Sequence, residues 1–124
     1  HLVKPLGFDM DDAKLRRAGL DYHDLAHVMV HESLDDALAQ VPGRVWALTG
    51  HANAMYSDVS YADGDGLLFG RESVGLSEEA MSHPRVEKRI RIHMREGVRS
   101  LNLANSASIV LYEAWRQLGF PGGV

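Results

Sequence analysis

The segment IRIHM (90–94), followed by the polar tract REGVRS (95–100) and by LNLANSASIVLYEAWRQLGF (101–120), decides the fold of this chain. Its first part alternates apolar and polar residues, as a strand does, and its last part carries apolar residues at helical spacing. Upstream, LLFGRESVGL (67–76) is a second apolar strand, which breaks into a glycine-bounded loop containing Glu72. Two strands that end in such loops predict one shared ligand pocket.

Strands and helices alternate along the whole chain. The patterns predict strands at 1–4, 27–31, 45–49, 66–70 and 89–92, and helices at 11–18, 33–39, 77–84 and 103–118. Ser33 and Ser77 are the expected starts of two helices, and Gly119 is the expected stop of the last one. The apolar face of the last helix is expected to comprise Leu103, Ala107, Val110, Leu111, Ala114 and Leu118. The uninterrupted apolar run VWALT (45–49) is typical of a central strand covered on both faces. The order predicts an α/β domain with a mostly parallel sheet flanked by helices. Ligands of such sheets bind beyond the carboxyl ends of the strands.

The composition is that of a globular domain. The chain has 124 residues, of which 45% are apolar and 24% charged, enough for one domain with a real core. It has no cysteine, which excludes disulfides, thiolate catalysis and cysteine-bound zinc. No apolar run is long enough for a membrane span and no leader is visible, so we expect a cytoplasmic protein that binds no membrane. The chain begins at His1 rather than methionine, which predicts a missing upstream segment.

Charge is unevenly distributed along the chain. The formal net charge is −4, yet the segment 83–99 has an excess of basic residues: Arg85, Lys88, Arg89, Arg91, Arg95 and Arg99 against Glu87 and Glu96. A second basic cluster comprises Lys14, Arg16 and Arg17. Such clusters can form a phosphate-binding face on an acidic protein, and they can equally be solvated surface.

The motifs named above resemble those of a known family. LLFGRESVGL (67–76), RIRIHM (89–94) and RSLNLANSASIVLYEAWRQLG (99–119) are similar to motifs two and three of the SPOUT RNA methyltransferases. The resemblance is closest to the tRNA (cytidine/uridine)-2′-O-methyltransferases, which act on the first anticodon nucleotide. It continues upstream through VKPLGF (3–8) and RVWALT (44–49), and thus covers nearly the whole chain.

This resemblance implies a fold and an activity. It implies a single SPOUT domain over residues 1–124, with a C-terminal trefoil knot and with the N-terminal strand and helix of the family missing. It implies a homodimer that uses S-adenosylmethionine (SAM) to methylate the 2′-hydroxyl of the wobble ribose in the anticodon stem-loop of tRNA. An enzyme acting on ribosomal RNA or on another tRNA position, and a non-catalytic RNA-binding relic, are the alternatives.

The resemblance also implies site residues. Cofactor contacts carry over to Leu48, Gly70, Ile92 and Ser100, with Thr49, Gly50, Glu72, Met94 and Leu101 as neighbours. The catalytic candidates are Arg99, Tyr112 and Asn105, and the RNA-binding candidates are Arg16, Arg17 and Arg99. Tyr112 could equally pack at a dimer interface.

Some positions depart from the family pattern. The first motif of the family, which supplies an arginine, is absent, and His93 stands where proline is usual. The pair Gly50-His51 replaces the usual threonine and lysine. The spacing of His23, His27 and His31 fits one helical face, but the segment 27–31 has the pattern of a strand, so we expect no metal site.

Overall fold

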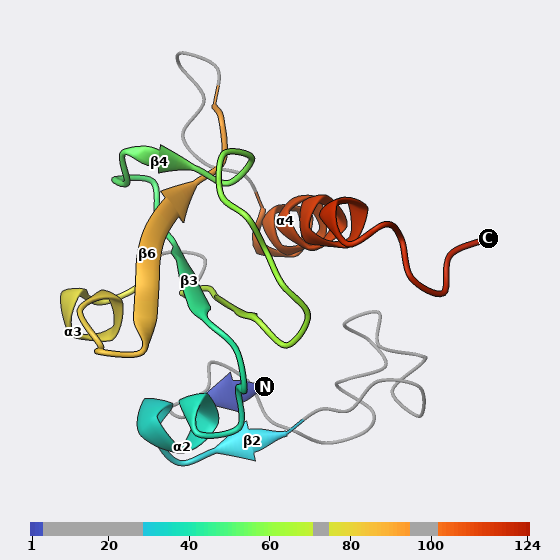
Figure 1. The fold of residues 1–124 in the computed structure, drawn as a ribbon. Helices are drawn as coiled ribbons and strands as arrows, with labels where there is room; N and C mark the ends of the chain where they lie inside the picture. The colour runs from blue at the N-terminus through green and yellow to red at the C-terminus, as the bar shows by residue number, and fades with distance from the viewer. Residues whose placement is uncertain (4–28, 71–74, 95–101) are drawn as a thin grey trace. The chain divides into compact units, whose positions relative to one another are not determined.

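The computed structural model describes residues 1–3, 29–70, 75–94 and 102–124. Within these ranges the chain forms two compact units, His1–Gln40 and Val41–Val124, which are considered separately (Figure 1). The expected helix 11–18 lies outside the described residues. No helix in the described ranges is long and apolar enough to cross a membrane.

The first unit contains a small parallel sheet and one short helix. Strands β1 (Leu2–Val3) and β2 (Val30–His31) pair in parallel, as the sequence predicted within the described part of these segments. Helix α2 (Leu34–Leu38) begins at Ser33, whose hydroxyl accepts a hydrogen bond from the Asp36 N–H at 3.2 Å. This N-cap confirms the helix start expected from the sequence.

The second unit is built on a four-stranded parallel sheet in the order β4-β6-β3-β5. Its strands are β3 (Val45–Leu48), β4 (Ala54–Met55), β5 (Gly66–Leu68) and β6 (Val86–Arg91). Because all four run the same way, their carboxyl ends meet at one edge. The mostly parallel sheet predicted from the sequence is confirmed, while the short strand β4 was not predicted and β6 begins three residues earlier than expected.

The interior strand β3 confirms the prediction of a strand covered on both faces. Val45, Trp46 and Ala47 are all buried, with exposed fractions of 3% or less. Trp46 belongs to the hydrophobic core, together with Tyr61, Ile90 and Val110. Since Val110 comes from the C-terminal helix, this helix and the sheet share one core.

Helix α4 (Leu103–Gln117) follows the predicted boundaries closely. Its N-cap Asn102 accepts hydrogen bonds from the backbone of Ala104 and Asn105, and Gly119 ends it with a φ of 86°. Two positions of the expected buried face are wrong, because Leu111 is 60% exposed and Leu118 is 40% exposed. The face against the sheet is centred on Val110 and Ala114, and Leu111 lies beside it.

Helix α3 (Glu78–Met81) is shorter than the segment 77–84 predicted from the sequence. Its N-cap is Ser77, as expected, because the Ser77 hydroxyl accepts a hydrogen bond from the Ala80 N–H at 3.1 Å. Glu78 pairs with Arg89 of β6 through both carboxylate oxygens, at 2.8 and 3.3 Å. This contact joins α3 to β6, and Figure 1 shows the two elements side by side.

Candidate functional site

The carboxyl edge of the parallel sheet brings together the expected cofactor residues that the structure describes. Leu48 ends β3, and the next residue, Thr49, donates its N–H to the Ile90 carbonyl at 3.0 Å. Leu48 and Ile92 are half-buried and both pack against the same core cluster. These two side chains therefore form a partly open apolar wall, which suits the flat face of an adenine base.

Gly70 lies at the same edge, two residues beyond the end of β5. A Cβ atom built on Gly70 would overlap the backbone of Gly75 and Leu76. Gly75 itself has a φ of 71°, in the left-handed region that favours glycine. The backbone at Gly70 thus lies close against that of Gly75 and Leu76, and only glycine fits at position 70.

The segment after β6 continues the same edge. His93 packs edge-on against Tyr56, with the ring centroids 5.9 Å apart and an angle of 75° between the planes. Tyr56 in turn donates its N–H to the Arg91 carbonyl at 2.8 Å. Met94 follows and is 38% exposed. The edge therefore carries an imidazole and a thioether beside the apolar wall.

Several of the expected site residues are not covered by the structure. They are the cofactor candidates Glu72, Ser100 and Leu101, the catalytic candidate Arg99, and the RNA-binding candidates Arg16 and Arg17, all of which lie outside the described residues. Gly50 is described, is exposed, and has open space where a side chain would stand. Asn105 is exposed in the first turn of α4.

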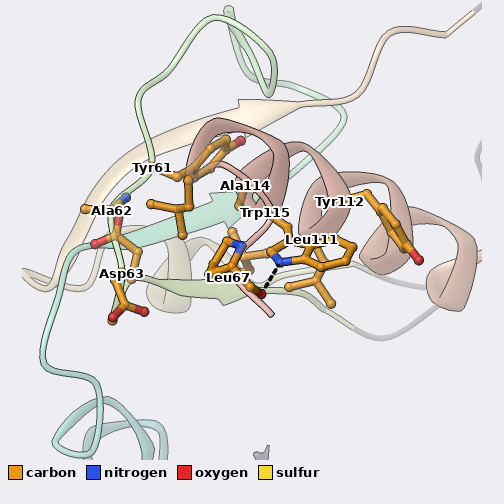
Figure 2. Close-up of a pocket in the computed structure, with 12 residues that line it drawn as sticks. Tyr61, Ala62, Asp63, Leu67, Leu111, Tyr112, Ala114 and Trp115 are labelled. Carbon is orange, nitrogen blue, oxygen red and sulfur yellow. Dashed lines mark hydrogen bonds between the residues drawn. The ribbon is translucent and has the colours of Figure 1, made fainter. Parts of the chain in front are cut away.

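Tyr112 lines a separate pocket between α4 and the segment Tyr61–Asp65 (Figure 2). The pocket has a volume of about 530 Å³, and its wall is largely apolar, with Leu67, Leu111 and Trp115 among its residues. Tyr112 is 61% exposed and contacts Trp115 edge-on, at 5.5 Å between centroids. Of the expected site residues that the structure describes, Tyr112 alone lines this pocket.

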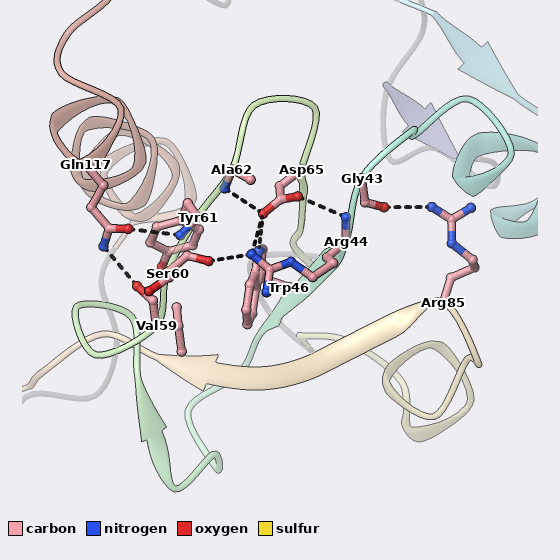
Figure 3. A network of polar contacts seen from close by, with 10 residues as sticks. All are labelled: Gly43, Arg44, Trp46, Val59, Ser60, Tyr61, Ala62, Asp65, Arg85 and Gln117. Carbon is pink, nitrogen blue, oxygen red and sulfur yellow. Dashed lines mark hydrogen bonds and ion pairs between the residues drawn. The ribbon is translucent and has the colours of Figure 1, made fainter.

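The pocket wall at Tyr61 is held by hydrogen bonds to α4. The Gln117 side chain accepts from the Tyr61 N–H and donates to the Val59 carbonyl, both at 2.9 Å (Figure 3). The Tyr61 hydroxyl donates to the Tyr56 carbonyl. Burial raises the pKa of this hydroxyl, and the negative charge of Glu113 raises it further, so Tyr61 stays a neutral donor.

Asp65 is the centre of a polar network that the sequence did not reveal. Its carboxylate accepts hydrogen bonds from the Trp46 indole at 3.0 Å and from the backbone N–H groups of Ala62 and Arg44, both at 2.9 Å (Figure 3). Its side chain is only 7% exposed. Burial pushes the pKa of Asp65 upward, but these hydrogen bonds and the Arg44 charge outweigh it and hold the pKa below its ordinary value of 3.8.

This network fixes the loop that leads into β5. Arg44 donates to the Ser60 carbonyl at 2.7 Å and lies 4.9 Å from the ring centre of Trp46. Asp65 lies two residues after Asp63 in the segment between β4 and β5, where the sequence patterns predicted no site. Three donors from Arg44, Trp46 and Ala62, of which Trp46 is buried, converge on this one carboxylate only in the folded chain, and no local sequence signal would have identified them.

Comparisons with known proteins agree with the fold and the motifs. Residues 1–112 match the model of the SpoU rRNA methylase family. A tRNA (cytidine(34)-2′-O)-methyltransferase from Methylovorus glucosotrophus is 48% identical over 125 residues, which cover 100% of this chain and 81% of that protein.

Solved structures are similar as well. A structure solved in work on the 2-OH methylation of cytidine or uridine 34 of tRNA superposes with a TM-score of 0.86 at 41% identity, over 96% of this chain and 78% of the other. An rRNA methyltransferase from Sinorhizobium meliloti, with AdoMet bound, has a TM-score of 0.72 at 25% identity, over 94% of this chain and 45% of the other. The chain belongs to the SpoU rRNA methylase family, within the SPOUT methyltransferases that its motifs resemble.

Proposed function

We propose that this chain is a SAM-dependent methyltransferase that modifies the 2′-hydroxyl of the ribose at nucleotide 34 of tRNA, the first anticodon position. The observation that carries the proposal is the 48% identity, over the full length of this chain, to a tRNA (cytidine(34)-2′-O)-methyltransferase. The rRNA methyltransferase with bound AdoMet is similar in fold but only 25% identical. The difference in identity favours tRNA over rRNA as the substrate.

The carboxyl edge of the sheet is the proposed cofactor site. Leu48 and Ile92 would form the apolar wall for the adenine, and Thr49, Gly50 and Met94 would surround it. Gly70 would keep the neighbouring loop close to this wall. The resemblance adds Glu72, Ser100 and Leu101 to this set. SAM supplies an electrophilic methyl group on a sulfonium centre.

The protein must then position a ribose hydroxyl and help remove its proton. Holding two reactants in line can lower the barrier by roughly 7–11 kcal/mol, so alignment is the main task of the chain. We propose that Arg99 holds a phosphate of the RNA, and that Asn105 and Tyr112 contact the ribose or assist the proton transfer. Arg16 and Arg17 are proposed as further RNA contacts with the anticodon stem-loop. No metal enters this proposal.

The role of Tyr112 can be tested separately from its packing. Replacing Tyr112 by phenylalanine keeps the edge-on contact with Trp115 and removes only the hydroxyl. We expect kcat to fall by about tenfold or more, as for the loss of one catalytic hydrogen bond or proton-transfer group, with no change in SAM affinity. Single-turnover methylation and calorimetric titration with SAM measure the two quantities. An unchanged kcat would leave Tyr112 with a packing role only.

We further propose that the enzyme is a homodimer that uses α4. This helix exposes apolar side chains that a lone chain leaves in water: Leu111 is 60% exposed, Tyr112 61% and Leu118 40%. Apolar surface of this kind is typical of a protein–protein contact. A shared helix face would also bring Tyr112 of one subunit toward the other subunit.

Leu111→Glu tests the dimer. A carboxylate at the centre of the proposed interface would be buried without a partner, so the dimer is expected to dissociate. Light scattering after gel filtration should then give about 13.7 kDa, the mass of one chain, instead of twice that value. Ala39→Glu adds the same charge at an exposed position outside α4 and should leave the mass unchanged. A wild-type protein that is already monomeric would contradict the proposal.

The remaining features of the family enter the proposal as expectations. We propose that residues 1–124 form one methyltransferase domain, which is supported by the family match that runs across both compact units. We also propose the trefoil knot of the family for the C-terminal part. A tRNA substrate implies that the enzyme works in the cytoplasm.

The function is tested by nucleoside mass spectrometry of tRNA incubated with the protein and isotopically labelled SAM. Labelled 2′-O-methylcytidine or 2′-O-methyluridine from the first anticodon position is the expected result. Label at another tRNA position would show that the enzyme modifies a different nucleotide. Label in rRNA alone would favour the rRNA alternative. SAM binding without any methyl transfer would favour a non-catalytic RNA-binding protein.

A further inference from the structure

Arg91 is the last residue of β6, at the carboxyl edge of the sheet where the proposed cofactor site lies. On β3, the residue level with its neighbour Ile90 is Leu48, and on β4 Arg91 itself is level with Met55. Ile90 is fully buried in the core, so the alternation of the strand directs Arg89 and Arg91 to the opposite face of the sheet. Arg91 therefore stands one residue from Ile92, on the other side of the strand.

The guanidinium of Arg91 carries a buried N–H group that finds no partner among the residues that the structure describes. Its Nε atom is buried and has no acceptor. Arginine is always charged, carries five N–H donors and has no acceptor of its own. A buried donor on a charged group that stays unsatisfied lowers stability, so such groups are rare unless a ligand completes them.

The other described arginines differ from Arg91 in this respect. Arg89, two residues away on the same face, forms a fork with Glu78, and Arg116 forms one with Glu113. Arg44 donates to the Ser60 carbonyl, and Arg85 donates to the carbonyls of Val41 and Gly43. Each of these four arginines therefore donates to an acceptor in the chain. Arg91 differs from them, and it is located at the sheet edge where substrate and cofactor would meet.

We propose that Arg91 is an oxyanion-binding residue of the substrate complex. Its fork would bind either a backbone phosphate of the bound RNA or the carboxylate of the cofactor, since both present two oxygens in the geometry that guanidinium prefers. This inference rests on the proposed function, because it takes its ligand from that reaction. It adds a positively charged contact to a site whose apolar wall is formed by Leu48 and Ile92.

The test compares Arg91→Met with Arg89→Met in the full chain. Both substitutions remove one positive charge from the same face of β6, so they change the long-range field similarly, but only Arg91 is assigned a ligand. Binding of tRNA is followed by fluorescence anisotropy over a series of salt concentrations, and binding of SAM by calorimetry. Thermal unfolding reports on the fold of each variant.

Arg91→Met is expected to lower the affinity for one of the two ligands, tRNA or SAM, by about tenfold, the usual effect of losing a hydrogen-bonded charge contact. Its melting temperature should be unchanged or higher, because an unsatisfied buried donor is removed. Arg91→Lys keeps the charge without the fork and should give an intermediate affinity. Arg89→Met should bind both ligands like the wild type.

The two ligand sources give different results. If the oxyanion is an RNA phosphate, the slope of log affinity against log salt falls by about one while SAM affinity is unchanged. If it is the cofactor carboxylate, SAM affinity falls and the slope is unchanged. The inference is overturned if Arg91→Met binds both ligands like the wild type, if its loss of binding accompanies a lower melting temperature, or if Arg89→Met has the same effect.

These readouts also separate this inference from the proposed function. A wild-type protein that binds tRNA and SAM but transfers no methyl group would contradict the function and still allow Arg91 to be tested. A wild-type protein that binds neither ligand would overturn both.

Discussion

Asp65→Ala is expected to lower the free energy of unfolding by about 3 kcal/mol, the largest stability effect that we predict for a single residue of the polar network. The substitution leaves the Trp46 indole N–H and the backbone N–H groups of Ala62 and Arg44 without their acceptor. The Trp46 side chain is buried in the core, so water cannot easily replace the lost oxygen. Urea unfolding followed by tryptophan fluorescence measures the change.

Asp63→Asn is the matched control, because Asp63 lies two residues away and is exposed. It should change the free energy of unfolding by less than about 0.5 kcal/mol. Asp65→Asn keeps the size of the side chain but turns an amide N–H₂ toward donors. Its free energy of unfolding should therefore lie between those of Asp65→Ala and Asp63→Asn. Equal stability of the Asp65 and Asp63 variants would show that the network contributes nothing.

The same carboxylate makes stability depend on pH in a defined direction. The pKa of Asp65 is lower in the folded chain than its ordinary value of 3.8. The unfolded chain therefore binds the proton more readily, and the stabilisation is fully present above about pH 4 and is lost as the pH falls through the folded pKa. Asp65→Asn should remove this part of the acid sensitivity, whereas Asp63→Asn should retain it.

Gly70→Ala is expected to weaken SAM binding by about 10- to 100-fold, and with it methyl transfer. The added Cβ would overlap the backbone of Gly75 and Leu76, so one of these two chain segments must move. Forcing an extra methyl group into a closely packed backbone contact costs about 1–3 kcal/mol, which corresponds to that loss if the displaced segment borders the cofactor. Calorimetric titration with SAM gives the affinity.

Gly50→Ala is the control for the effect of an added methyl group on the fold. A Cβ on Gly50 meets nothing within 4 Å, so its melting temperature should equal that of the wild type. Gly70→Ala should lower both the melting temperature and the SAM affinity. Wild-type SAM affinity in Gly70→Ala would mean that the close approach of these segments has no part in cofactor binding.

The sequence predicted the frame of the fold because its signals are local. The apolar run of β3, the serine caps of α2 and α3 and the stop at Gly119 each depend on a few neighbouring residues. Strand β4 was missed because it has only two residues and forms through pairing with β6. Local propensity carries little information about so short a strand.

Contacts between distant residues could not be predicted. The hydrogen bonds of Asp65 to Arg44 and Trp46 span about 20 residues of chain, and Gln117 reaches Val59 across 58 positions. Leu111 was placed in the core because helical spacing does not distinguish a residue at the margin of a buried stripe from one at its centre.

The positions of the candidate site residues could be predicted from the sequence only in part. The placement of Leu48, Gly70 and Ile92 at one sheet edge follows from the parallel order of the strands, which the sequence predicted and the structure confirms. Their assignment as cofactor contacts came from the resemblance to a family and stays a prediction. The unsatisfied Nε atom of Arg91 was visible only in the structure, because an unpaired donor is defined by its surroundings.

Methyl transfer to two tRNA molecules that differ by one oxygen atom tests the central claim most directly. One carries a normal ribose at nucleotide 34, and the other carries a 2′-deoxyribose at that position alone. With labelled SAM, the account predicts that the first tRNA is methylated and that the second takes up no label, although both should bind the protein with similar affinity. Equal labelling of the two would contradict the account, because the methyl group would then be going to another atom.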